Sequence, residues 1–471
     1  ISSNESLSQG YSAVGFPDGD FSYPSFSNGY PEYGTPAYYE SVSRSVNGYF
    51  NAGYAFDDRY LMDFSLRTSG SSVFGTSRKY NTTWSVGVGW NLHKEKFIMD
   101  HVAWINVLKL RASIGNPGNQ SFDSAQSLLT YAFQFGSMNY FGLGAELSQV
   151  GNPDLEWQIT VDKNIGLDVT LFNKRFSLTA DYYYKVTDPL LIKVSTPLSS
   201  GTATYMTNAG EQVSQGFTAS VSYYIFQDFE KRFSWMVRAN VRTQKNRIDK
   251  IGNKLSTLNS SGKGSNTVRY YDGADPDDIW AVKSAGIDPS NGKELFYAKD
   301  GSYTYDFSYD DEVICGNTRP DVEGVIGSSL NWKGFSVSLN FRYQMGADVF
   351  NEALYSKVEN ISRSDLNKNQ DKRALYERWQ EEGDIVRFKN IASAETTPMS
   401  SRFVQEENVL TLESVYLGYE FYDGWIKKLG LSSLKFQVSM RDVFRASTIR
   451  SERGISYPFA RSMEAGLSFN F

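Results

Sequence analysis

Cysteine and histidine are scarce in this sequence. Its 471 residues include one cysteine, Cys315, and two histidines, His93 and His101. A single cysteine excludes an internal disulfide framework. Both histidines fall in the segment 92–106, and no cysteine or carboxylate cluster at metal-ligand spacing accompanies them. We therefore interpret them as surface or turn residues and predict no metal site.

Catalytic and phosphate-binding motifs are also lacking. The chain has no Walker A loop, no G-x-S-x-G elbow and no H-E-x-x-H motif, so we predict neither an enzyme nor a bound cofactor. The acidic run YDGADPDD (271–278) lacks the spacing and the closing Glu of a calcium-binding EF-hand, which favours a solvated loop. Positive charge is not in excess, because the net charge is −6, and this argues against a nucleic-acid binder.

Long apolar runs are missing too. No stretch of about 18 or more apolar residues exists, so no transmembrane helix is predicted. The opening residues, ISSNESLSQG, show neither an initiator Met nor a signal peptide. We expect that a signal has been removed or that the chain is a piece of something longer. Membrane β-barrels escape such hydropathy tests, because their strands alternate apolar and polar residues.

Aromatic residues are abundant. They make up 15% of the chain, with 31 Tyr and 31 Phe, and such residues suit a pleated sheet. Strict alternation of apolar and polar residues runs through 175–186, 232–246, 335–345 and 434–441. The last ten residues, SMEAGLSFNF, follow the same pattern and end on Phe471. This pattern predicts strands that are apolar on one face and polar on the other.

Two architectures are compatible with that alternation, and the connections discriminate between them. A soluble sandwich would bury the apolar face against another sheet, whereas a membrane barrel would turn it toward lipid. Short turns at one end and long polar loops at the other are typical of bacterial outer-membrane barrels. We predict about thirteen strands on these criteria, near 43–56, 60–68, 81–91, 107–115, 157–172, 175–187, 209–226, 232–247, 322–332, 335–345, 408–421, 433–443 and 462–471. The long loops are 116–156, 188–208, 248–321 and 346–407.

Strand parity fixes the expected orientation. If the strand ending at Phe56 runs toward the periplasm, the last strand does so too, and 1–42 form an extracellular loop region. If the stretch SLLTYAF (127–133) were a further strand, the last strand would run in the opposite direction. We therefore assign this stretch to an extracellular loop. The connection 92–106 is long enough to contain a helical turn. An odd number of strands cannot close a barrel alone, so 43–471 should be part of a larger one.

Several segments together resemble one family. YLMDFSLRTSGSSVFGTSRKYNTTWSVGVGWNLHKEKFI (60–98) resembles a stretch usually written R-x-D-G-S-S-x-F-G, then S-x-G-x-G-W and E-x-F, with Ser69 in place of the Asp. LKLRASIGNPGNQ, GNPDLEWQITVDKNIGLD, NAGEQVSQGF, AGIDPSNGKELFY, YLGYEF and the terminal YPFARSMEAGLSFNF follow in the family's order. RDVF (441–444) stands where that family tends to show Asn-Leu-Phe. The chain thus resembles the C-terminal barrel region of SusC/RagA-type TonB-dependent transporters of Bacteroidota.

The resemblance implies an all-β fold and a location. The chain would be the C-terminal portion, about thirteen strands, of a transmembrane antiparallel β-barrel of the 22-stranded TonB-dependent type. The plug domain would be absent from this chain, and the remaining barrel and plug would come from an N-terminal segment or a separate chain. The expected localisation is the bacterial outer membrane, with membrane lipid around the barrel.

The implied function is active import of an oligomeric nutrient, a glycan or a peptide, driven through the TonB complex. A SusD-like surface lipoprotein would cap the extracellular mouth. Two other functions stay open. A passive porin or structural barrel component would work without TonB, and a soluble carbohydrate-binding β-protein or enzyme would need no detergent.

The candidate functional residues come from the polar faces of strands and from one loop. A wet lumen needs polar lining in any barrel, so these charges can pair with one another or meet a plug as well as contact substrate. The candidates facing the lumen are Asp63, Arg67, Lys109, Arg111, Asp181, Arg238, Arg242, Arg342 and Arg441. The loop aromatics Tyr303, Tyr305 and Phe307 would stack on sugar rings, pack the loop itself or meet the lipoprotein.

Overall fold

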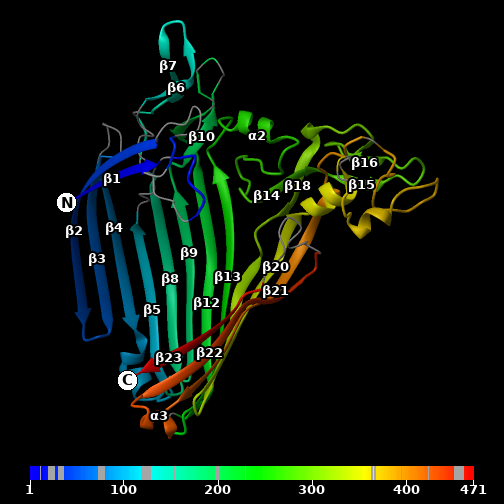
Figure 1. Cartoon of the computed structure of the whole chain (residues 1–471). Coiled ribbons are helices and arrows are strands. Elements are labelled where there is room, and N and C mark those ends of the chain that lie inside the picture. The colour runs from blue at the N-terminus through cyan, green and yellow to red at the C-terminus, as the bar shows by residue number, and fades with distance from the viewer. Residues whose placement is uncertain are drawn as a thin grey trace.

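One long antiparallel sheet dominates the computed structural model (Figure 1). The structure describes the whole chain apart from residues 11, 20–26, 30–36, 73–79, 118–128, 153, 157, 197, 198, 200, 203, 229, 362, 363, 365, 366, 394, 423, 450–460 and 471. The predicted position of Phe471 therefore lies outside the described residues.

Within the described residues the main sheet has 14 strands, and each strand pairs with its neighbours in sheet order. All thirteen predicted strands are present in it, so local alternation located them correctly. The strands are β1 (Ser2–Gly10), β2 (Ala37–Phe56), β3 (Tyr60–Ser71), β4 (Tyr80–Asn91), β5 (Ile105–Asn116), β8 (Thr160–Leu171), β9 (Phe176–Thr187), β12 (Glu211–Asp228), β13 (Phe233–Asp249), β19 (Val322–Trp332), β20 (Phe335–Phe350), β21 (Val404–Phe421), β22 (Ser433–Ser447) and β23 (Met463–Asn470).

The additional strand is β1. It lies within 1–42, where the sequence predicted a loop region, and it pairs with the first nine residues of β2, from Ala37 to Ser45. β3 pairs with β2 from Ser45 onward, so β1 and the start of β2 form a hairpin that extends beyond β3. In Figure 1 this hairpin bends over the end of the sheet that carries the long loops. The extracellular position of 1–42 stays a prediction.

The sheet curves into an open wall (Figure 1). Among the described residues, no ladder joins β23 to β1 or β2, so both outer edges of the sheet carry unpaired backbone groups. Such edges pair readily with further strands.

Tight turns join the strands at one end of the wall. Several turn residues have the positive φ that two-residue hairpins require, including Asp57 (53°), Asn173 (55°) and Lys333 (45°). Two connections at this end are longer and contain short helices, as predicted for 92–106. These helices are η2 (Leu92–Lys94), α1 (Lys96–Met99) and, between β21 and β22, α3 (Trp425–Lys428).

Glu95 anchors the first of these connections to the wall. Its carboxylate accepts hydrogen bonds from Trp90 Nε1 at 2.9 Å and from the Tyr60 hydroxyl at 3.0 Å. Arg59 lies 3.4 Å from the same carboxylate. The hydrogen bonds from Trp90 and Tyr60 lower the pKa of Glu95.

The long connections at the other end form their own small elements. Residues 130–149 make a separate hairpin outside the wall, so residues 130–133 of the stretch 127–133 form a strand but not a wall strand, while 127 and 128 lie outside the described residues. The extracellular position of this stretch stays a prediction. Among the described residues, no helix is long and apolar enough to span a bilayer. The elements are β6 (Thr130–Asn139), β7 (Gly142–Gln149), β10 (Leu191–Ser195), β11 (Thr204–Asn208), α2 (Ser256–Gly262), β14 (Asp278–Val282), β15 (Ser284–Ile287), β16 (Glu294–Tyr297), β17 (Tyr303–Thr304), η4 (Tyr309–Asp311), β18 (Glu312–Asn317), η5 (Leu354–Glu359), η7 (Lys372–Leu375) and η8 (Ser401–Phe403).

Most of the buried apolar residues lie in these connections, and a few, such as Val213 and Ile248, lie on wall strands. Residues 250–321 and 351–403, termed the loop lobe below, project to one side in Figure 1. One buried cluster contains Leu354, Val358, Phe388 and Phe403. A single-layered wall has no second sheet to bury its apolar face, so its large apolar side chains stay exposed to whatever surrounds it.

Candidate functional site

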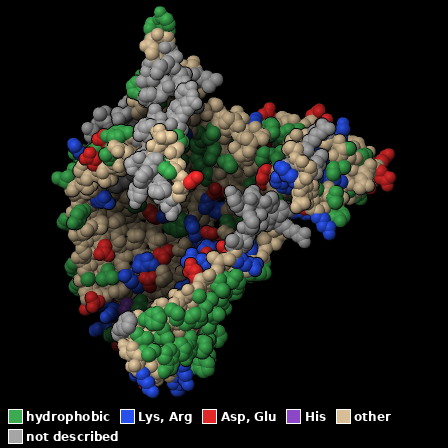
Figure 2. All heavy atoms as spheres, viewed as in Figure 1, with side chains coloured by type: hydrophobic (Ala, Val, Ile, Leu, Met, Phe, Trp, Pro, Cys, Tyr) green, Lys and Arg blue, Asp and Glu red, His purple; other side chains and the backbone are tan. Residues whose placement is uncertain are grey.

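The strand register sorts the wall into two chemically distinct faces. Directly opposed residues of an antiparallel pair share a face. One row across seven strands is apolar and largely exposed: Tyr54, Met62, Val88, Ala112, Ile165, Tyr182 and Phe217. The row on the opposite face is small or polar: Gly53, Asp63, Gly87, Ser113, Asn164, Tyr183 and Gly216. Figure 2 shows the charged side chains in the hollow of the wall and hydrophobic ones outside it.

The register places all nine predicted lumen residues on the polar face. Arg111 and Asp181 both oppose Gly166, and Asp181 opposes Thr218. Thr218 in turn opposes Arg242, which opposes Glu323. The pairings of the other candidates lead to the same face. Their contact with a substrate or a plug stays a prediction.

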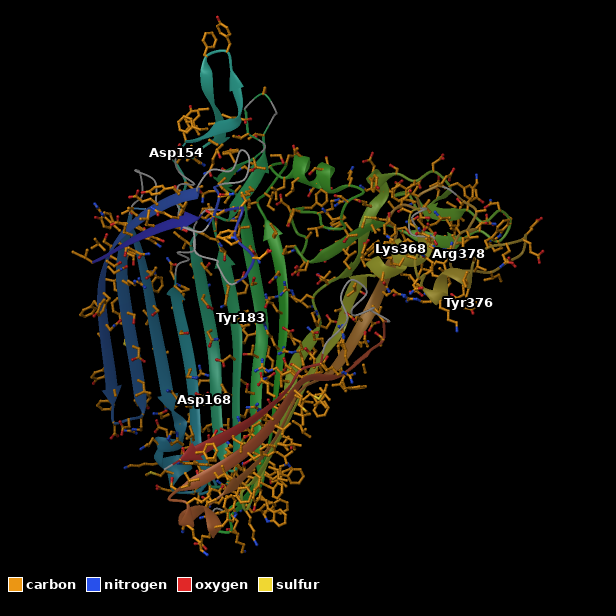
Figure 3. All side chains as sticks on the ribbon, in the orientation of Figure 1. Asp154, Asp168, Tyr183, Lys368, Tyr376 and Arg378 are labelled. Carbon is orange, nitrogen blue, oxygen red and sulfur yellow. The ribbon has the colours of Figure 1, made fainter. Side chains whose placement is uncertain are left out.

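Arg111 is the centre of the best-formed cluster on this inner face. Its Nε donates to Asp168 Oδ2 at 2.7 Å, and its Nη2 lies 3.1 Å from Asp181 Oδ1. Figure 3 labels Asp168 within the wall. Gly166 makes room for the cluster, because a Cβ there would lie 2.4 Å from Asp181 Oδ1 and 2.7 Å from the Arg111 guanidinium carbon. The cluster bridges three strands, β5, β8 and β9.

Other inner-face charges are paired as well. Arg342 Nη2 lies 2.7 Å from Glu413, and Arg242 Nη1 lies 3.6 Å from Glu323. Arg238 donates to the Asn340 side chain at 2.9 Å. Among the residues that the structure describes, Asp63, Lys109 and Arg441 have no ion-pair partner within 4 Å. The inner face therefore presents mixed charges rather than a field of one sign.

The sequence prediction included Asp181, one partner of Arg111, but missed the other carboxylate partners of these arginines. Asp168, Glu323 and Glu413 lie far along the chain from the arginines that they neutralise. Alternation along the strand could have placed Asp168 on the inner face, because it lies two residues from Gly166, which is on that face. Alternation along a strand predicts which face of the sheet a side chain lies on. Only the strand register shows which side chain of the neighbouring strand lies beside it.

A cavity of about 880 Å³ opens on the inner face beside the Arg111 cluster. Arg67, Arg111 and Asp181 line it, and Arg67 also donates to Asn47 at 3.0 Å. Its other lining groups are mostly hydroxyls and amides: Asn51, Ser65, Thr83, Ser85, Ser113, Asn116 and Asn164. Such a surface hydrogen-bonds polar solutes.

The three predicted loop aromatics have different environments. Phe307 packs edge-on against Phe296 and Tyr309, with ring centroids 5.2 Å and 4.8 Å away. The Tyr305 hydroxyl donates to Asp288, and this hydrogen bond lowers the pKa of that carboxyl. Tyr303 is 63% exposed. Phe307 thus contributes to loop packing, whereas Tyr303 is largely exposed although its ring centroid lies 4.9 Å from that of Tyr297.

Carboxylates of the acidic run 271–278 accept hydrogen bonds from backbone N–H groups and so stabilise their own loop. Asp272 accepts from the backbone N–H groups of Ile251 and Gly252 at 2.7 Å and 3.1 Å. Asp275 accepts from the backbone of Asn246 and Asp277, and burial raises its pKa. Within the described part of the chain, no group of three or more His, Cys, Asp or Glu side chains is arranged to hold a metal ion.

Buried charge in the loop lobe ties its two segments together. Arg402 Nη2 lies 2.8 Å from Glu294 and 2.7 Å from Glu359, and the Glu359 side chain is fully buried. The Ser400 hydroxyl donates to Glu294 at 2.5 Å. These contacts join 250–321 to 351–403, so the two longest connections form one unit.

An antiparallel wall with an apolar outer face, a charged inner face and unequal connections at its ends belongs to an outer-membrane β-barrel. Residues 3–361 match the family described as "TonB dependent receptor-like, beta-barrel", and the chain belongs to this family. The expected partial-barrel fold and outer-membrane location are thereby confirmed. Proteins of this family are receptors and transporters rather than enzymes.

Two curated relatives and one solved structure show the same likeness. TonB-dependent receptor P39 of Formosa agariphila is 26% identical over 448 residues, covering 84% of this chain and 42% of that protein. TonB-dependent receptor SusC of Bacteroides thetaiotaomicron is 26% identical, covering 82% and 39%. The RagAB peptide transporter structure shares the fold, with a TM-score of 0.78 at 23% identity over 90% of this chain and 46% of that chain.

The chain spans about half the length of the curated relatives that it matches. The resemblance to the SusC/RagA type is confirmed by these matches.

Proposed function

We propose that this chain forms part of the wall of a TonB-dependent importer that moves an oligomeric nutrient, a glycan or a peptide, across the outer membrane. The observation that carries the proposal is the continuous inner face of paired charges, hydroxyls and amides. A polar oligomer passing along it exchanges hydrogen bonds with successive groups. Because most charges are already neutralised, no single contact holds the solute tightly.

The remainder of the protein would close the wall. In the part of the chain that the structure describes, the sheet has two unpaired edges, and the matched relatives are about twice as long as this chain. A missing N-terminal barrel and plug segment, in the same or a separate chain, would pair with β23 and with the lower part of β2. The TonB complex would act through that segment.

A SusD-like lipoprotein would meet the end of the wall that carries the loop lobe. Two features support this placement. The lobe is internally cross-linked by the Arg402 network, so it offers a stable surface, and Tyr303 and Tyr305 are exposed on it. The solved RagAB structure bears the name of a peptide transporter, which favours a peptide over a glycan as cargo.

Dependence on TonB tests the function. The full-length protein, expressed in its own bacterium, should take up fluorescent oligopeptides or oligosaccharides at a rate that falls to background when TonB is deleted. A passive porin predicts unchanged uptake without TonB, and that result would overturn the proposal.

Co-purification tests the partner. Affinity capture of the tagged full-length protein from detergent-solubilised outer membranes should bring down a surface lipoprotein in stoichiometric amount. Replacing Tyr303 and Tyr305 by Ser should weaken this capture, whereas the same change at Phe307, which packs internally, serves as a test of lobe folding. Isolation of the protein without any lipoprotein would contradict the partnership.

A further inference from the structure

A hollow of about 480 Å³ lies at the tight-turn end of the wall, between the β12–β13 turn and the β19–β20 turn. It is not part of the inner face, and the proposed import function does not use it. Its lining consists of three cations, one carboxylate and two aromatic rings: Lys231, Arg232, Lys333, Glu230, Phe233 and Trp332. Two turns from different hairpins thus bring positive charge to one place.

The three cations differ in how strongly they are engaged. Lys231 pairs with Asp228 at 3.1 Å, but its side chain is 81% exposed. The Arg232 guanidinium carbon lies 4.6 Å above the centre of the Tyr422 ring. Among the described residues, Lys333 has no ion-pair partner. The backbone N–H of Lys333 donates to the Arg232 carbonyl at 3.0 Å, so the two turns are fixed relative to each other.

Arg232 has φ of 51° and Lys333 has φ of 45°, the positive values that tight hairpin turns require. Turn geometry therefore accounts for both backbone conformations, and the case for a ligand rests on the side chains that line the hollow.

The apolar part of the hollow belongs to the outer face of the wall. Phe233 opposes Trp332, and Trp332 opposes Phe335. Trp332 and Phe335 are 52% and 54% exposed. Phe226 extends the aromatic surface, because its ring centroid lies 5.4 Å from that of Phe233. Aromatic residues in this position form the belt at the membrane interface, so the cations lie at the depth of lipid headgroups.

We propose that this hollow binds the headgroup of an anionic phospholipid. The lipid phosphate would contact Lys333 and Arg232, and its acyl chains would lie along Trp332 and Phe335. Three cations stand against two carboxylates, Glu230 in the lining and Asp228 beside Lys231, so the site keeps a positive balance that suits a negative headgroup. In outer-membrane barrels the tight turns are periplasmic, so the ligand would come from the periplasmic leaflet. The inference rests on the outer-membrane location and is independent of what the protein imports.

Native mass spectrometry of the purified full-length protein in detergent tests the site. Titration with phosphatidylglycerol should give a tighter one-to-one adduct than titration with phosphatidylcholine. Each basic residue near an anionic lipid contributes about five-fold in affinity, so Lys333→Gln should weaken phosphatidylglycerol binding about five-fold and the Arg232→Gln, Lys333→Gln double variant about twenty-five-fold. Inorganic phosphate at millimolar concentration should not displace the lipid.

Lys174→Gln is the matched control. Lys174 lies in the β8–β9 turn at the same end of the wall, has φ of 66°, and does not line the hollow. It should leave the phosphatidylglycerol affinity unchanged. Equal binding of the two lipids by the wild-type protein would overturn the proposal even if a variant failed to fold. An equal loss in Lys174→Gln, or displacement by inorganic phosphate, would overturn it too.

Discussion

At the scale of single residues, the inner face depends on exact complementarity between charged side chains and the glycines beneath them. Arg111 neutralises Asp168 and Asp181 together, and Gly166 leaves the space in which all three meet. The side chains in this cluster are only 21–32% exposed. An ion pair shielded to this degree contributes more than one in open solvent.

Removing the Arg111 side chain should therefore destabilise the wall. Arg111→Met leaves two carboxylates close together without their cation, and we expect a loss of about 1–2 kcal/mol in the free energy of unfolding. Urea unfolding of the full-length protein in lipid vesicles measures it. Arg342→Met is the control, because the Arg342–Glu413 pair is 48% and 41% exposed and its loss should cost under about 1 kcal/mol. Equal effects would contradict the argument.

Glycine positions should differ sharply in their tolerance of a methyl group. A Cβ at Gly324 would lie 2.0 Å from the Asn240 carbonyl oxygen, whereas a Cβ at Gly48 meets nothing within 4 Å. Gly324→Ala should cost about 1–3 kcal/mol through overpacking, and Gly48→Ala should be nearly neutral. Parallel urea unfolding curves of the two variants test this, and a neutral Gly324→Ala would show that the strands separate more easily than the structure indicates.

At the scale of elements, the connections at the tight-turn end are held by specific side chains rather than by a core. Glu95 fastens the β4–β5 connection through Trp90, Tyr60 and Arg59. The sequence predicted a helical turn here but not the anchor, because Tyr60 and Trp90 lie on strands whose register was unknown and Arg59 lies in the turn before β3.

The anchor should respond to acid. The folded pKa of Glu95 is lowered, so the stabilisation is present above the unfolded value, about 4.3, and is lost as the pH falls through the lower folded value. Hydrogen exchange of 92–104, expressed as protection factors, should fall in that window. Glu95→Gln should show reduced protection already at pH 7 and little further change in acid. Unchanged protection of the wild-type connection at pH 3 would refute the role of Glu95.

Elements with local alternation could be predicted from the sequence, and elements held by long-range contacts could not. Strands such as β20 were predicted because Phe335, Val337 and Leu339 alternate with polar residues over one continuous stretch. β1 was missed because SSNESLSQG contains a single large apolar residue, Leu7, and so lacks alternation. The elements of the loop lobe were missed for a different reason. Their cohesion comes from long-range contacts such as Arg402 with Glu294, 108 residues apart, which no local pattern encodes.

At the scale of the whole molecule, the wall, its two faces and its unequal ends describe part of an outer-membrane barrel. The partial barrel was predicted from an odd count of thirteen strands, and β1 makes the count fourteen, so that premise is wrong. The partial barrel rests instead on the family match and on the open edges of the sheet among the described residues. The cargo is not encoded in any of these features, because a lining of mixed, paired charges suits many polar oligomers.

The most direct test of the central claim is the initial rate of uptake of a fluorescent oligomer by cells that express the full-length protein, before and after a protonophore collapses the proton-motive force. An importer energised through TonB should lose uptake to the level of cells that lack the protein, while its surface binding of the oligomer persists. Uptake that continues at the original rate would contradict active import and indicate a passive pore.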